Sequence, residues 1–188
     1  MQLELIKYQY LNKGSELQKM AFEELVKSEI LSTLNDYKPV VAGTFPLNIA
    51  TETSDLDILC QVNDFESFSS YISSKCDYFD KFSIRSKFFQ GKEALIVNYE
   101  GYNLPVEIFC QNLNPYRQLA YVHMEAERVI LNEMDPEFRS RIIDLKNEGF
   151  KTEPAFAKLL GLEGDPYLSI IQYVFDMTRD PMFDPKSF

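Results

Sequence analysis

Two aspartates, Asp55 and Asp57, stand inside an otherwise apolar run of the chain, S-D-L-D-I-L-C-Q-V. Because side chains alternate between the two faces of a strand, residues 55–62 predict a strand with both aspartates on one face. The opposite face is wholly apolar and is formed by Leu56, Ile58, Cys60 and Val62. Adjacent carboxylates on such a strand are typical of a functional site, although a solvated strand edge is the simpler alternative.

A second strand-like run, L-P-V-E-I-F-C-Q at 104–111, has the same phase, because Glu107 alternates with apolar residues. If both strands belong to one sheet, three carboxylates converge on one face, and their repulsion raises the pKa of at least one of them. A divalent cation such as Mg²⁺ would relieve this repulsion, and it prefers carboxylate and phosphate oxygens. The three acids therefore indicate a metal site that also receives phosphates. For Glu107 alone, an exposed strand glutamate is the simpler alternative.

A glycine, Gly43, follows the short strand-like run V-V-A. Because glycine has no side chain, backbone N–H groups at this point can approach a phosphate closely. The hydroxyl of Thr44 adds another hydrogen-bond donor. A Gly-Thr pair is a weak signal by itself, but ahead of the aspartate pair it predicts a phosphate-binding turn beside the acids.

The order of these motifs resembles the nucleotidyltransferase superfamily typified by DNA polymerase beta. That superfamily has a helix, a strand ending in Gly-Gly or Gly-Ser, a strand with an apolar-flanked Asp-x-Asp, and a third acid on a later strand. Two departures are Thr44, where Gly or Ser is commoner, and Glu107, where Asp is commoner. The whole chain looks closest to a small bacterial family of unknown function within the superfamily. This closer resemblance extends into the stretches A-Y-V-H-M-E and K-T-E-P-A-F-A.

The resemblance implies transfer of a nucleoside monophosphate from a nucleoside triphosphate to a hydroxyl of a small molecule or protein, with release of pyrophosphate. It implies Mg²⁺ (or Mn²⁺) as the cofactor. The catalytic residues and metal ligands would be Asp55, Asp57 and Glu107, and Glu107 would also help to deprotonate the acceptor hydroxyl. The nucleotide-binding residues would be Gly43, Thr44, Ser54 and Lys87. For Lys87, a solvated surface position is the simpler interpretation.

The pattern of elements predicts an α+β protein with a nucleotidyltransferase-like mixed β-sheet, flanking helices, and a C-terminal helical segment. We expect the core at residues 1–112 and the helical segment at residues 113–188. An amphipathic helix is expected over Ser15–Tyr37, and a second from Asp64 as N-cap to about Phe79. Later helix starts are expected at Pro115, Thr152 and Asp165.

The formal net charge is −10, from 29 acidic and 19 basic residues, and no basic stripe is visible. Long nucleic acid is therefore disfavoured as a substrate, because its binding needs clustered basic residues. No apolar run approaches the roughly 20 residues of a membrane helix, and no signal pattern is present, so we expect a cytoplasmic protein that does not bind membranes. Three cysteines without metal-ligand spacing are interpreted as small buried hydrophobes.

Two other functions remain open. The same fold could serve without catalysis, as a nucleotide-binding module or as an antitoxin-type partner of a toxin. The three acids favour the enzyme, because a pure binder does not need all of them. A glycosyltransferase could also use Asp-x-Asp to hold a metal and a nucleotide sugar, but its doubly wound domain needs a longer alternation of strands and helices.

Two further features are given structural interpretations. His123, the only histidine, lies on an apolar helical stripe and is interpreted as a core residue with satisfied nitrogens rather than a catalytic one. Glu127, one turn further on, could orient its ring. The stretch Lys151–Pro154 is interpreted as a helix start, with anion binding as the alternative.

Overall fold

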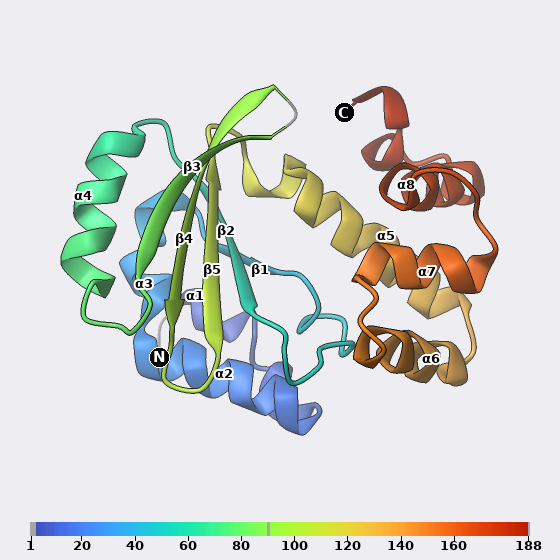
Figure 1. Cartoon of the computed structure of the whole chain (residues 1–188), viewed down its shortest axis with the longest axis horizontal. Helices are drawn as coiled ribbons and strands as arrows, with labels where there is room; N and C mark the ends of the chain where they lie inside the picture. Colours follow the sequence, from blue (N-terminus) through green and yellow to red (C-terminus); the bar gives the residue numbers. More distant parts are fainter. Residues whose placement is uncertain (1–2, 90, 188) are drawn as a thin grey trace.

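A five-stranded mixed sheet forms the centre of the computed structural model, which describes residues 3–89 and 91–187 (Figure 1). The strand order across the sheet is β1-β2-β5-β4-β3. The strands are β1 (Val40–Ala42), β2 (Leu56–Gln61), β3 (Ser83–Phe89), β4 (Lys92–Glu100) and β5 (Pro105–Gln111). Strands β2 and β5 are parallel, whereas the other neighbouring pairs are antiparallel. This architecture confirms the predicted α+β class and mixed sheet.

The register of β2 against β5 decides where the acids lie. Asp57 is the partner of Glu107, and Leu56 and Ile58 are the partners of Val106 and Ile108. Partners in a sheet project to the same face. The apolar face of both strands is therefore continuous, and Asp57 and Glu107 are neighbours on the other face.

The helices before and between the strands cover the apolar face of the sheet. They are α1 (Leu3–Ile6), α2 (Glu16–Ser28), α3 (Ile30–Thr33) and α4 (Phe65–Cys76). Helix α2 begins with a capping box between Ser15 and Gln18. The single helix expected over Ser15–Tyr37 is wrong, because Glu29 adopts φ 51° and separates α2 from α3. Asp64 caps α4 as expected, by accepting a hydrogen bond from the backbone N–H of Ser67 at 3.0 Å.

The helices after the sheet form a second group, seen in yellow to red in Figure 1. They are α5 (Leu119–Glu133), α6 (Pro136–Asn147), α7 (Thr152–Leu160) and α8 (Pro166–Thr178). Asp165 caps α8 as expected. Thr152 does not cap α7, because Lys151 occupies the N-cap position and Thr152 is the first helical residue. Short 3₁₀ helices lie at Leu11–Lys13, Asn35–Tyr37, Pro115–Arg117, Pro181–Phe183 and Pro185–Ser187.

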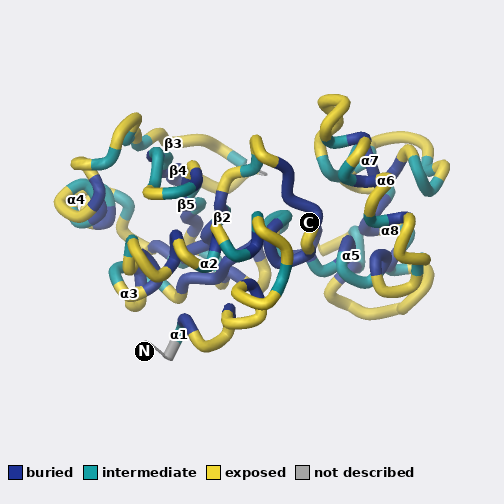
Figure 2. Tube along the Cα trace, turned by 90° about the horizontal axis from the view of Figure 1, so that it is seen from below, coloured by how far each residue is buried: buried dark blue, intermediate teal, exposed yellow. Residues whose placement is uncertain are grey.

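Two clusters of buried apolar side chains hold these layers together, and Figure 2 shows the buried segments inside each group. One cluster lies between the sheet and α1–α4 and includes Ile58 and Cys60. The other lies among α5–α8 and also takes in Ala42 and Leu59, from the face of the sheet that carries the acids. That face is therefore partly covered by the C-terminal helices. The division into domains at residue 112 stays a prediction, although the last strand ends at Gln111.

Among the helices of the described residues, none combines the length and the apolar character needed to cross a membrane.

Candidate active site

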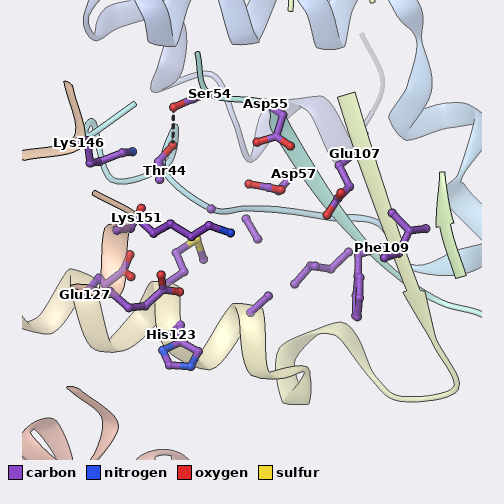
Figure 3. Close-up of a pocket in the computed structure, with 18 of the residues that line it drawn as sticks. Thr44, Ser54, Asp55, Asp57, Glu107, Phe109, His123, Glu127, Lys146 and Lys151 are labelled. Atoms are coloured by element: carbon purple, nitrogen blue, oxygen red, sulfur yellow. Dashed lines mark hydrogen bonds between the residues drawn. The ribbon is translucent and has the colours of Figure 1, made fainter. Parts of the chain in front are cut away.

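A cleft of about 670 Å³ lies between the acid-bearing face of the sheet and the C-terminal helices (Figure 3). All three predicted catalytic acids line it, as do the predicted nucleotide-binding residues. Asp55 stands immediately before β2, Asp57 lies within β2, and Glu107 lies within β5. Figure 3 shows their carboxylates directed into the same cavity. The structure thus brings together the residues that strand alternation placed on one face.

Asp57 lies in an environment that disfavours a charged carboxylate. Burial raises its pKa well above the usual value, and the neighbouring charges of Asp55 and Glu107 raise it further. Within the described chain, its carboxylate accepts no hydrogen bond and forms no ion pair. A desolvated carboxylate beside two others has high affinity for a cation, because the cation offsets both burial and repulsion.

Gly43 is a glycine for two physical reasons. Its φ is +70°, in the left-handed region that side chains other than glycine rarely adopt. A Cβ at this position would also overlap the Oδ2 atom of Asp57. The missing side chain therefore lets the backbone of the turn lie against the carboxylate of Asp57.

The hydroxyls of Thr44 and Ser54 connect the two ends of the loop between β1 and β2. Thr44 Oγ1 donates to Ser54 Oγ at 3.5 Å, and Ser54 Oγ accepts from the backbone N–H of Thr51 at 3.0 Å. Both side chains line the cleft. They place two hydroxyl groups next to Gly43 and Asp55, where a bound phosphate would need donors.

Glu107 has partners from the neighbouring strands. Its Oε2 atom accepts a hydrogen bond from Asn98 Nδ2 at 3.1 Å and forms an ion pair with Arg85 at 3.4 Å. Lys87, two residues after Arg85 on β3, is exposed and also lines the cleft, with its Nζ 5.8 Å from the ring centroid of Phe89. Arg85 is a second cation at this site, in addition to the predicted Lys87.

The helical wall of the cleft holds polar residues that lie outside the predicted set of catalytic and nucleotide-binding residues. His123 and Glu127 come from α5, and Glu153 comes from the first turn of α7. Lys146 on α6 donates from Nζ to the backbone carbonyl of Ile49 at 2.7 Å. Burial lowers the pKa of Lys146, whereas the nearby acids, Glu127 first and Asp57 next, oppose this shift. Lysines are common on amphipathic helices, so no sequence pattern predicts that Lys146 lies in the cleft.

His123 is buried as expected, but its nitrogens are not satisfied. Only 5% of the residue is exposed, and neither ring nitrogen has a hydrogen-bond partner in the described part of the chain. Its ring lies edge-on to Tyr167, with the centroids 5.7 Å apart. Burial lowers its pKa to about 4, so the imidazole is neutral at pH 7.

The donor set fits a hard divalent cation in its chemistry. Carboxylate oxygens are the ligands that Mg²⁺ prefers, and Asp57 has an unpartnered carboxylate beside two further acids. Across residues 3–89 and 91–187, however, no three His, Cys, Asp or Glu side chains are grouped in a way that could hold a metal ion. Binding of Mg²⁺ by Asp55, Asp57 and Glu107 therefore stays a prediction.

Comparison with solved structures identifies the class of fold. The chain is similar to the Cid1 poly(U) polymerase bound to MgGTP, with a TM-score of 0.50 and 14% identity over 74% of this chain and 45% of the other. It is also similar to the polymerase core of TRAMP, an RNA surveillance complex, with a TM-score of 0.50 and 12% identity over 98% of this chain. Likeness at this level of identity shows the fold alone, and the predicted nucleotidyltransferase-like fold is confirmed. This chain spans 45% and 58% of their lengths.

Residues 23–173 match the family model of DUF4269, a domain of unknown function, so the chain belongs to that family. No curated protein matches the sequence. The closer resemblance to a small bacterial family within the nucleotidyltransferase superfamily stays a prediction.

Proposed function

We propose that this protein is a metal-dependent nucleotidyltransferase that moves a nucleoside monophosphate from a nucleoside triphosphate to a hydroxyl of a small molecule or protein. The observation that supports this most directly is the placement of Asp57 beside Glu107, behind the Gly43 turn, in a nucleotidyltransferase fold. In the reaction, the acceptor oxygen forms a bond to the α-phosphorus. The bond from that phosphorus to pyrophosphate breaks, and the acceptor proton is removed.

Asp55, Asp57 and Glu107 would hold Mg²⁺ (or Mn²⁺), which supplies charge stabilisation at the reacting phosphate. The backbone of Gly43 and the hydroxyls of Thr44 and Ser54 would donate hydrogen bonds to the phosphates. Oε2 of Glu107 is occupied by Asn98 and Arg85, so Oε1 is the oxygen that would accept the proton of the acceptor hydroxyl.

The exposed cations on β3 complete the expected nucleotide site. Lys87 lines the cleft and is free to contact the outer phosphates of a triphosphate. Arg85 already interacts with Glu107 and would sit near the same phosphates. Neither cation is buried, so each would add modest affinity rather than catalytic power.

The acceptor is expected to differ from those of the similar polymerases. One of these is a poly(U) polymerase, and the other is the polymerase core of an RNA surveillance complex. This chain carries a formal charge of −10 and spans about half of their lengths. Long RNA would be repelled by such a chain, because polymer binding depends on neutralising phosphates with basic residues. A small molecule or a protein side chain is the acceptor that the charge favours.

The test is a transfer assay with labelled triphosphates and Mg²⁺ or Mn²⁺, made with wild type, Asp57→Asn and Asp80→Asn. Asp80 is exposed and does not line the cleft, so its change is the matched control. We expect transfer by wild type and Asp80→Asn only. Nucleotide binding without any transfer, unaltered in Asp57→Asn, would instead support the non-catalytic nucleotide-binding or antitoxin-type partner.

A further inference from the structure

Resting on the proposed function, we propose that the helical wall of the cleft is the acceptor subsite. Glu127 and Glu153 bind an ammonium group of a small hydroxyl-bearing acceptor. The acceptor is thus an amino alcohol or amino sugar rather than a nucleic acid. Figure 3 shows Glu127 and His123 on α5 on one side of the cavity and Asp57 with Glu107 on the other.

Glu127 is the first observation that carries this inference. Only 3% of the residue is exposed, and it lines the cleft from α5. In the described chain it takes part in no hydrogen bond or ion pair. A buried carboxylate is costly unless it is paired, so an unpartnered one that faces a cavity indicates a ligand. Burial raises its pKa well above the usual value, and Glu153 adds to the shift.

His123 is a further unsatisfied polar residue in this wall. It lies one helical turn before Glu127 and lines the same cavity, with both ring nitrogens unpartnered. Both nitrogens are enclosed and the ring packs edge-on against Tyr167 of α8, so His123 borders the subsite behind Glu127 without opening onto it.

The charges around the two glutamates favour a cation on the ligand. Two lysines line the same wall. Lys146 is already bonded to the carbonyl of Ile49, and Lys151 is exposed and lies at the N-cap of α7. Neither forms an ion pair with Glu127 or Glu153 within the described residues. An ammonium group on the ligand would supply the missing partner, whereas the phosphates of a nucleic-acid backbone would be repelled by the two carboxylates.

The subsite is close enough to the acids to serve the transfer. The charge of Glu153 contributes to the raised pKa of Asp57. The charges of Glu127 and Asp57 both act on the pKa of Lys146. One cavity of about 670 Å³ contains both groups. That volume accommodates a nucleotide and a small acceptor, since ordinary ligand sites occupy roughly 300–1,000 Å³. An acceptor held by α5 and α7 would therefore present its hydroxyl toward Glu107.

The experiment measures binding to the full chain without nucleotide, by titration calorimetry and by thermal melting. The probes are glucosamine, galactosamine and ethanolamine, each beside its N-acetylated counterpart, which keeps the hydroxyls but loses the charge. We expect at least one amine to bind at least tenfold more tightly than its counterpart. Glu127→Gln should weaken the binding of that amine at least tenfold. Glu133 is an exposed acid on the same helix, and Glu133→Gln should leave the binding unchanged.

Equal binding of amines and N-acetyl compounds, no binding by any amine, or full affinity in Glu127→Gln would overturn the proposal. Extension of an oligouridylate by wild type would also overturn it in favour of a polymer acceptor. Thermal melting with ATP and Mg²⁺ is measured separately on each variant. If the nucleotide response is absent but amines still bind, the proposed function fails and the subsite stands; the reverse result removes only the subsite. A folded Glu127→Gln is verified by its melting transition.

Discussion

Asp57 and Glu107 are register partners on the parallel strands β2 and β5, and both line the same cleft. Two carboxylates in this relation repel each other, and the charge of Glu107 is one of the causes that raise the pKa of Asp57. Native sheets avoid like charges directly opposite unless another group offsets them. A cation between the strands and the β1–β2 loop would supply that offset, which makes this pair the first place to test.

Asp57→Asn should lower nucleotide transfer by about a thousandfold or more, because the charge that would hold the metal at the reacting phosphate is lost. The free energy of unfolding without metal should stay equal or rise, since one source of repulsion is removed. Chemical denaturation in a chelator and a transfer assay measure the two effects. A destabilised variant with full transfer would identify Asp57 as structural.

Gly43→Ala should destabilise the fold more than Gly161→Ala does. Both glycines have positive φ, +70° and +66°, so both changes add backbone strain of about 1 kcal/mol. Only at Gly43 does the new Cβ meet a side-chain atom, Oδ2 of Asp57, whereas no atom lies within 4 Å at Gly161. The difference between the two free energies of unfolding therefore isolates the contact, and equal losses would show that Asp57 moves aside freely.

Alternation along strands was enough to predict the acid side of the cleft. Asp57 and Glu107 were placed on one face by the phase of their apolar neighbours, because a period of two leaves only two orientations. Asp64 and Asp165 were recognised as caps, since N-capping is a local interaction. Local chemistry thus accounts for the parts of the site that lie on the sheet.

The helical side could not be predicted in the same way. Lys146 meets the carbonyl of Ile49, 97 residues away in sequence, and no local pattern specifies such a pairing. The apolar stripe predicted that His123 is buried, but it could not show that both nitrogens lack partners. The break at Glu29 was also missed, because the helical periodicity continues across it without a glycine or proline signal.

Lys146→Met should loosen the loop between β1 and β2. Lys146 and Arg139, both on α6, donate to the backbone carbonyls of Ile49 and Leu47. Loss of a hydrogen bond from a charged donor to a partly buried carbonyl costs about 1–3 kcal/mol. Hydrogen exchange of residues 44–54 should accelerate relative to wild type. Lys13→Met, an exposed lysine far from this loop in the chain, is the control, and equal protection in both variants would contradict the anchoring role.

His123 should make stability depend on pH in a defined window. Burial lowers its pKa from 6.5 to about 4, so between these values the unfolded chain binds a proton that the folded chain does not. The contribution is fully present above pH 6.5 and is lost as the pH falls toward 4, with a total on the order of 3 kcal/mol. Glu127 and Asp57 have raised pKa values and act with the opposite sign, but they do so equally in a His123→Gln variant. Subtracting the variant's free energy of unfolding from that of wild type at each pH therefore isolates the histidine. A difference that stays constant from pH 4 to 7 would show that the folded protein protonates His123 as readily as the unfolded chain does.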